Sequence, residues 1–79
     1  MYYVYILESV SYSGRYYTGK TIDIRRRLEE HNRHKEEYAS RYKPWKLKTY
    51  IAFESEDRAI EFEKYLKTPS GRAFAKKRL

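Results

Sequence analysis

The sequence predicts a single domain of mixed α and β structure, because strand-like and helical segments follow one another in a clear order. A hairpin comes first, then a helix, a further strand and a second helix, all within 79 residues. No apolar run approaches the roughly 18 residues that mark a membrane-spanning helix, and the chain starts without the basic leader of a secretion signal. We therefore expect one domain over residues 1–79, cytoplasmic and without a membrane partner.

The charge of the sequence is basic and unevenly distributed. Its 18 Lys and Arg residues against 11 Asp and Glu residues give a net charge of +7. Residues 15–48 and 64–79 each carry +6, and they flank an acidic stretch, residues 49–63, of −4. This pattern favours a polyanion binder with a local cation or proton site, although a merely solvated basic surface has the same charge. The absence of cysteine excludes disulfides and thiolate metal sites.

Three segments have the composition of β-strands. Residues 1–7 are apolar at both alternating sets of positions, which is typical of a strand in the middle of a sheet. A turn at residues 11–14 and a β-rich segment at residues 15–19 complete a hairpin. Residues 46–54 alternate in polarity, as a half-exposed strand does. The apolar face of this third strand is predicted to hold Leu47, Thr49, Ile51 and Phe53.

The first helix is predicted to follow the hairpin. Thr21 suits its N-cap and Asp23 its first turn, and the pattern extends to about Asn32. At about 100° per residue, one arc of this helix holds Ile24, Arg27, Leu28 and His31. Arg27 and His31 therefore flank an apolar stripe rather than face the solvent.

The rest of the chain contributes a second helix and two less regular segments. Ser55 is predicted as the N-cap of the second helix. Residues 33–43 form a loop or a short helix that Pro44 ends. Residues 69–71 are expected to break the second helix, and residues 72–79 to form a basic terminal turn or helix. The apolar face of the second helix is predicted to hold Ala59, Ile60, Phe62 and Leu66.

Glu63 lies in the middle of the apolar face of that second helix. An ionised carboxylate in such a place costs several kcal/mol in lost hydration unless it is paired or bound to a metal ion. Two explanations stay open: a salt bridge to Arg27 or another basic residue, and a metal site.

Candidate site residues occur at several points along this scaffold: Tyr5, Tyr17, Lys20, Arg27, His31 and Glu63. A lone carboxylate with waters is a common way to hold Mg²⁺ when a phosphate supplies the remaining oxygens. Arginine and lysine stabilise charge on phosphoryl oxygens, and a tyrosine can orient or deprotonate an attacking water. The set therefore predicts hydrolysis of a phosphodiester bond.

Other common sites are excluded or disfavoured. The sequence has no G-x-x-x-x-G-K-[ST] loop, no G-x-G-x-x-G, no H-E-x-x-H and no cysteine nucleophile. His31 and His34 are the only imidazoles, so a zinc centre would need carboxylates from distant parts of the chain.

The motifs resemble the GIY-YIG endonuclease superfamily, in particular its small stand-alone members and the N-terminal nuclease domain of the UvrC excinuclease. Residues 3–5, Tyr-Val-Tyr, stand where the family has Gly-Ile-Tyr, and residues 17–20, Tyr-Thr-Gly-Lys, where it has Tyr-Ile-Gly-Lys. Arg27, His31 and Glu63 stand where the family has an arginine, in several members a histidine, and a metal-binding glutamate. The resemblance extends over about residues 2–78.

The match has three departures. Tyr3 replaces the first glycine of the family pattern, and Thr18 replaces the central isoleucine. The asparagine that several members carry after the glutamate has no counterpart, because Asn32 is the only asparagine of the chain.

The resemblance implies an α+β sandwich in which helices flank a three-stranded antiparallel sheet made of the hairpin and a third strand. It further implies a DNA endonuclease that uses Mg²⁺ or Mn²⁺, is selective for DNA structure and acts in repair or recombination. The implied catalytic residues are Tyr5, Tyr17, Arg27, His31 and Glu63. The implied phosphate and nucleic-acid contacts are Lys20, Arg26, Arg41 and Lys43.

Individual roles follow from the same resemblance. Glu63 would bind the metal ion, and Tyr5 or Tyr17 would act as general base. We expect Tyr17 to be closer to the substrate and Tyr5 to be the more buried of the two. His31 would assist by hydrogen bonding.

Two other functions fit the same sequence. The first is a basic nucleic-acid-binding module that keeps the fold without turnover, and the second is a structural or ribosome-associated basic protein. The choice between DNA and RNA, the preferred substrate structure, a protein partner and a homodimer stay open at this stage.

Overall fold

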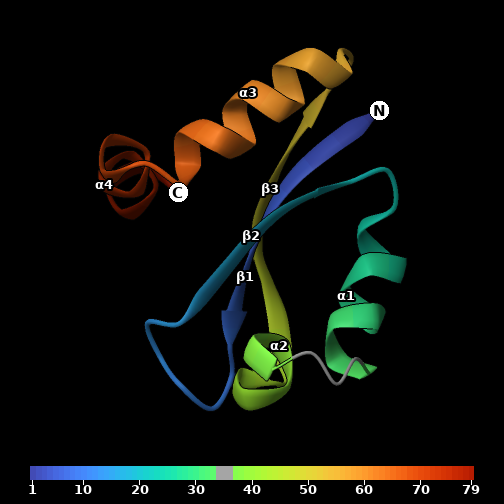
Figure 1. Cartoon of the computed structure of the whole chain (residues 1–79), viewed down its shortest axis with the longest axis vertical. Coiled ribbons are helices and arrows are strands. Elements are labelled where there is room, and N and C mark those ends of the chain that lie inside the picture. The colour runs from blue at the N-terminus through green and yellow to red at the C-terminus, as the bar shows by residue number, and fades with distance from the viewer. Residues whose placement is uncertain (34–36) are drawn as a thin grey trace.

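The computed structural model describes residues 1–33 and 37–79, and it contains one three-stranded antiparallel sheet and four helices (Figure 1). The strands are β1 (Tyr2–Ser9), β2 (Tyr16–Thr21) and β3 (Trp45–Phe53). The helices are α1 (Ile24–Arg33), α2 (Glu37–Tyr42), α3 (Glu56–Leu66) and α4 (Pro69–Arg78). The predicted α+β fold, a hairpin plus a third strand flanked by helices, is confirmed.

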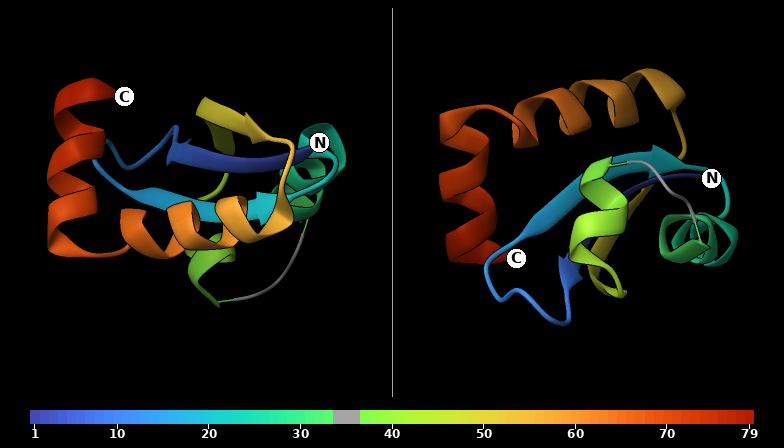
Figure 2. Two further views of the ribbon diagram at one scale, coloured as in Figure 1. Left: turned by 90° about the horizontal axis from the view of Figure 1, so that it is seen from above. Right: turned by 60° about the horizontal axis from the view of Figure 1, so that its bottom comes forward.

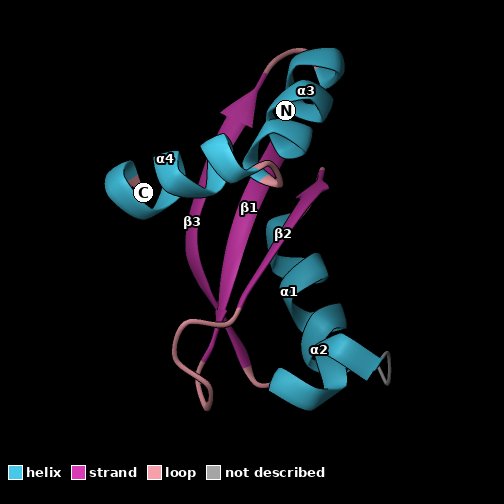
Figure 3. Ribbon diagram, turned by 60° about the vertical axis from the view of Figure 1, so that its left-hand side comes forward, coloured by secondary structure: helices cyan, strands magenta, loops and turns pink. Residues whose placement is uncertain are grey.

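The sheet has the order β2-β1-β3, so β1 is the central strand, as its two apolar faces predicted. On one face, Val4 and Ile6 pack with residues of α3 and α4. On the other face, Tyr5 and Leu7 pack with residues of α1 and α2. Helices therefore cover both faces of the sheet, and the two further views separate the pair α1 and α2 from the pair α3 and α4 (Figures 2 and 3).

The third strand departs from its predicted pattern at one point. Burial alternates along β3 as expected, but the register with β1 shifts between Ile6 and Leu7. Such a bulge adds a residue to one strand and turns the side chains beyond it to the other face. Leu47 therefore packs beside Leu7 on the α1 and α2 side, whereas Phe53 packs on the opposite side. The prediction that both share one face is wrong.

The start of α1 also differs from the prediction. Thr21 is the last residue of β2, and its hydroxyl accepts a hydrogen bond from the Asp23 backbone N–H at 3.1 Å. The Asp23 carboxylate accepts from the backbone N–H of Arg26 at 3.1 Å, which is the bond that an N-cap side chain makes. Asp23 is therefore the capping residue, and Thr21 holds Asp23 in place.

The cap of α3 is as predicted, because the Ser55 side chain accepts from the backbone N–H of Arg58. The end of α3 differs from the prediction. Residues 69–71 form the first turn of α4, with Thr68 as its N-cap and Pro69 at its first position. A Cβ on Gly71 would lie 2.7 Å from the Leu66 Cα, so the glycine permits α3 and α4 to meet closely.

The segment between α1 and β3 contains the short helix α2, one of the two predicted alternatives. His34 lies outside the described residues. Within residues 1–33 and 37–79, every helix is too short or too polar to cross a membrane.

Asn32 attaches α1 to the beginning of β3. Its Oδ1 accepts from the backbone N–H of Trp45 at 2.6 Å, and its Nδ2 donates to the Trp45 carbonyl at 3.2 Å. Replacing Asn32 with alanine leaves both partly buried backbone groups without this partner, so we expect it to lower the free energy of unfolding by about 2–3 kcal/mol. Urea denaturation measures the loss. The exposed Glu29, replaced by alanine in the same helix, is the control, and an equal loss in both variants would contradict the role of Asn32.

Candidate active site

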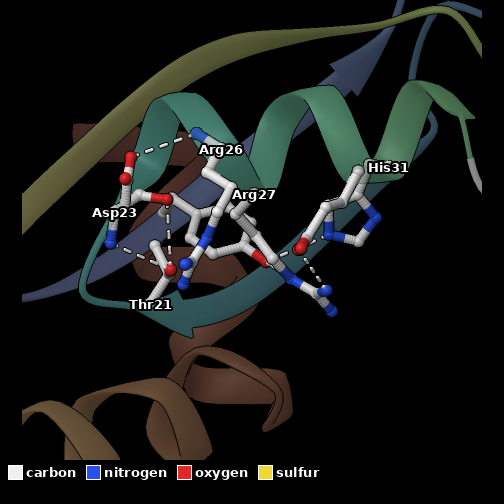
Figure 4. A network of polar contacts seen from close by, with 7 residues as sticks. Thr21, Asp23, Arg26, Arg27 and His31 are labelled. Atoms are coloured by element: carbon white, nitrogen blue, oxygen red, sulfur yellow. Dashed lines mark hydrogen bonds and ion pairs between the residues drawn. The ribbon is translucent and has the colours of Figure 1, made fainter.

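The inward face of α1 brings Arg27 and His31 to the same tyrosine of β1 (Figure 4). The Tyr5 hydroxyl lies 3.0 Å from His31 Nε2, and it accepts a hydrogen bond from Arg27 Nε at 3.3 Å. The Tyr5 hydroxyl can donate its own hydrogen to His31 Nε2 in the ring tautomer that leaves this nitrogen as the acceptor. Tyr5 and His31 are only 2% and 3% exposed. The helical spacing of residues 27 and 31 thus produces a buried polar cluster.

Gly19 makes room for the Tyr5 side chain. The two residues are partners across β1 and β2, so their side-chain positions lie on the same face of the sheet. A Cβ on Gly19 would lie 2.7 Å from the Tyr5 Cζ and closer still to its hydroxyl. The Tyr5 ring therefore extends over Gly19 of an edge strand, and its hydroxyl reaches Arg27 and His31 of α1.

Burial and charge act in opposite directions on Tyr5. Loss of hydration raises the pKa of Tyr5 above its ordinary value, and the hydrogen bond and charge of Arg27 oppose that rise. The hydrogen bond to Tyr5 raises the pKa of Arg27, with a smaller contribution from its hydrogen bond to Glu30. Arg27 Nη1 lies 3.1 Å from Glu30 Oε1. Arg27 is therefore a permanently charged group, and Tyr5 is protonated near neutral pH.

Tyr17 joins the same cluster from β2. Its ring centroid lies 4.3 Å from that of His31 and 6.3 Å from that of Trp45. Tyr17 is partly exposed, whereas Tyr5 is buried, which is the order of burial expected for the two tyrosines. His31 is therefore in contact with both tyrosines.

Glu63 belongs to α3, which packs on the other face of the sheet. Its side chain is 22% exposed, and its Oε2 lies 3.0 Å from Lys67 Nζ, one turn further along the helix. Of the two explanations, the structure therefore shows a salt bridge, and its partner is Lys67 just after the same helix rather than Arg27. Arg27 pairs with Glu30 instead. The charge of Glu63 still raises the pKa of Tyr5, so the carboxylate lies within electrostatic range of the cluster.

None of the four predicted nucleic-acid contacts is among the residues hydrogen-bonded to Tyr5. Lys20 pairs in register with Val4, so it lies on the α3 side, where its Nζ is 3.3 Å from Glu56 Oε2. The structure therefore does not bring Lys20 to the Arg27 guanidinium. The other three are exposed on α1, on α2 and just after α2: Arg26, Arg41 and Lys43.

The donor groups near Tyr5 fit a weakly coordinated hard cation rather than a protein-enclosed metal. In the described residues, no three His, Cys, Asp or Glu side chains gather in a way that could hold a metal ion. Glu30 is paired with Arg27, and one partly exposed carboxylate such as Glu63 suits Mg²⁺, which keeps several waters and takes further oxygens from a phosphate.

Comparison with known proteins agrees with this geometry. The model of the GIY-YIG catalytic domain matches residues 1–78. The chain belongs to the GIY-YIG family. It is similar to the UPF0213 protein BH0048 from Bacillus halodurans, whose solution structure was determined by NMR. The two are 31% identical with a TM-score of 0.57, and the likeness covers 96% of this chain and 81% of that one. No curated protein matches the chain.

GIY-YIG proteins form a nuclease family, and its nucleases use divalent metal ions. The departures of this GIY-YIG domain from the family motifs have visible places in the fold. Tyr3, where the family has glycine, packs edge-on against Tyr50 at 5.7 Å between ring centroids. Thr18, where the family has isoleucine, pairs with Ile6 on the face away from Tyr5. Neither departure lies in the Tyr5 cluster.

Sequence reasoning missed three residues that shape the site. Glu30 and Lys67 pair with Arg27 and Glu63 at spacings of three and four residues, and those spacings are visible in the sequence. Gly19 leaves room for the Tyr5 ring, and predicting this required the register of β1 against β2. The length of the hairpin alone does not determine that register.

The raised pKa of Tyr5 gives a direct test of its burial. We expect Tyr5 to titrate above its ordinary pKa of 10.0, as a late step when phenolate absorbance is followed with rising pH. Because this pKa is higher in the folded than in the unfolded chain, the stability that Tyr5 contributes is complete below about pH 10 and is lost as the pH rises through the raised value. Tyr5→Phe should remove the late step and Tyr50→Phe should leave it. A late step that survives Tyr5→Phe would contradict the assignment.

Proposed function

We propose that this GIY-YIG domain is a divalent-metal-dependent endonuclease that hydrolyses phosphodiester bonds of DNA. The observation that carries the proposal is the convergence of Tyr5, Arg27 and His31 at an edge of the sheet that the Glu63 carboxylate also influences. Phosphodiester hydrolysis needs a cation for the phosphate, a group that handles the proton of water, and a carboxylate for a metal ion. Arg27 supplies the cation and Glu63 the carboxylate, and Tyr17, whose ring packs against His31, supplies the group for the proton of water.

Arg27 is the proposed phosphate ligand. Tyr5 and Glu30 anchor its Nε and Nη1, so its guanidinium is held in one orientation while its side chain is 35% exposed. Because these two contacts fix the orientation of the guanidinium, its Nη2 group can donate to a phosphate oxygen. Because the pKa of Arg27 is raised, its charge is present at every pH at which the chain is folded.

The two tyrosines have different proposed roles. Tyr17 is partly exposed, so we assign it the contact with the attacking water, which it orients or deprotonates. Tyr5 is buried and hydrogen-bonded, so we assign it the positioning of Arg27 and His31. In the reaction, the water oxygen forms a bond to phosphorus and passes one proton to Tyr17 or to solvent, the bond from phosphorus to the leaving sugar oxygen breaks, and that oxygen takes a proton from solvent.

Glu63 is the proposed metal ligand, with water and phosphate oxygens as the other ligands. A bound divalent ion stabilises the negative charge that develops on the phosphoryl oxygens and acidifies coordinated water. Before metal binding, Lys67 neutralises the Glu63 carboxylate, and the flexible lysine side chain, 55% exposed, is free to swing into solvent. Mg²⁺ and Mn²⁺ are the ions that fit this oxygen site.

The proposal is tested with purified protein on supercoiled plasmid and on linear, flapped and four-way DNA. We expect cleavage with Mg²⁺ or Mn²⁺ and none after the metal is removed with EDTA. Cleavage that persists undiminished in EDTA would contradict the metal requirement. DNA binding without cleavage in either metal would support a non-catalytic binding module, which the ion pair between Glu63 and Lys67 favours. A role in DNA repair and a likeness to UvrC stay predictions of the sequence.

A further inference from the structure

A basic groove lies between the β1–β2 hairpin, the end of α3 and α4, on the face of the sheet opposite to Tyr5. Its volume is about 970 Å³. Figure 2 shows α4 beside the β1–β2 hairpin. The floor includes Ile6, Leu66 and Ala75, and none of the described residues that line the groove is acidic. Its basic lining residues are Arg15, Lys48, Lys67, Arg72 and Lys76.

These five cations come from separate parts of the chain and converge on one concavity. Arg15 belongs to the hairpin turn, Lys48 to β3 and Lys67 to the end of α3, and the other two belong to α4. Among the described residues, Lys67 is the one of the five that forms an ion pair. A concave surface with cations on several walls and no acidic lining attracts a polyanion that enters it.

The shape and floor of the groove favour a single nucleic-acid strand over a duplex. A duplex presents phosphates on its outside and hides its bases, so an apolar floor offers it nothing. A single strand places phosphates on the basic walls and bases on apolar and aromatic side chains. Tyr16 lines the groove and is 44% exposed, with Lys48 Nζ 5.6 Å from its ring centroid. A volume in the range of small-ligand pockets, about 300–1,000 Å³, admits a few nucleotides.

The groove is joined to the candidate active site by two residues. Tyr17 is among its lining residues, and the Tyr17 ring packs against His31. Lys67 is another lining residue, and its ammonium group contacts the Glu63 carboxylate. A strand bound in the groove would therefore lie beside Lys67 and its partner Glu63, the proposed metal ligand.

We propose that this groove binds a single-stranded segment of DNA and so directs branched DNA with a single-stranded arm to the nuclease site. The choice of DNA over RNA rests on the proposed function. The binding itself does not need hydrolysis, because the groove residues Arg72, Lys76 and Lys48 lie outside the Tyr5 cluster.

The test compares two double variants of α4 that remove the same charge. Arg72→Gln with Lys76→Gln changes the groove, and Lys77→Gln with Arg78→Gln changes exposed residues of the same helix that do not line it. Binding of a fluorescent oligothymidylate of about twelve nucleotides is measured by anisotropy in EDTA, over a series of salt concentrations. We expect a loss of about tenfold or more in affinity and a shallower salt dependence for the groove pair, and less than about threefold for the control pair. Circular dichroism checks that both variants are folded.

Several outcomes would overturn the groove assignment. Equal losses in the two double variants would show that net charge alone drives binding. Binding of a blunt duplex as tightly as of the single strand would exclude a single-strand site, and so would the absence of saturable binding. The two proposals fail separately. If the groove variant binds and cleaves DNA with the same substrate preference as the wild type, only the groove proposal is rejected. If binding depends on the groove but no metal ion supports cleavage, only the nuclease proposal is rejected.

Discussion

Replacing Glu63 with glutamine is expected to reduce the rate of DNA cleavage by about a thousandfold, which corresponds to roughly 4 kcal/mol of lost transition-state stabilisation. Glutamine keeps the shape of the side chain but removes the charge that a divalent ion needs. The fold should change little, because the ion pair with the mostly exposed Lys67 is worth only a few tenths of a kcal/mol. Single-turnover cleavage with saturating metal ion measures the effect.

The matched control for this variant is Glu61→Gln. Glu61 lies on the exposed side of the same helix, and its replacement removes the same charge. We expect its cleavage rate to stay within about twofold of the wild-type rate, since it touches neither the Tyr5 cluster nor the groove. If both variants cleave equally well, Glu63 is not the metal ligand. If both lose activity equally, the acidic charge of α3 acts as a whole rather than through one carboxylate.

Those parts of the fold and of the candidate site that local periodicity determines could be predicted from the sequence. The arc that holds Arg27 and His31 follows from helix geometry over four residues, and in the structure both contact Tyr5. The central position of β1 follows from its two apolar faces. The inward position of Glu63 follows from the same kind of wheel, and its side chain is 22% exposed.

Features that depend on pairing between distant segments could not be predicted. The bulge opposite Ile6 and Leu7 moves Leu47 to the other face of the sheet. The alternation of polar and apolar residues in β3 gives no sign of this bulge. The placement of Lys20 on the α3 side follows from its register with Val4, not from its distance along the chain to Arg27. The basic groove forms because residues 69–78 make the helix α4 and contribute one of its walls. The sequence predicted only a turn or a helix for the terminal segment.

The residues of the candidate site come from helices on both faces of the sheet. Arg27 and His31 come from a helix on one face, and Glu63 comes from a helix packed on the other. Tyr5 reaches Arg27 and His31 across β2, which carries a glycine where the Tyr5 ring crosses it. A residue with a side chain at position 19 would collide with that ring.

Gly19→Ala is therefore expected to damage both the fold and the activity, although the added group is one methyl. Its Cβ would lie 2.7 Å from the Tyr5 Cζ, and Tyr5 is 2% exposed with no open space to move into. Overpacking of this kind costs about 1–3 kcal/mol of stability. Displacement of the hydroxyl from Arg27 and His31 should lower the cleavage rate by about a hundredfold, because a shift of about 1 Å in a catalytic group has that effect.

A double-mutant cycle with Tyr5→Leu separates this contact from a general effect on β2. Leucine has no atom at the Cζ position, so Gly19→Ala in that background should cost almost nothing or stabilise the strand, since alanine restricts the unfolded chain more than glycine does. The expected coupling free energy from urea denaturation is about 1–2 kcal/mol. An equal cost of Gly19→Ala in both backgrounds would mean that backbone conformation, not the Tyr5 ring, requires glycine at this position. The φ angles argue against that reading: among the described glycines, Gly14 has a positive φ and Gly19 does not, so the space over residue 19 is what the tyrosine needs.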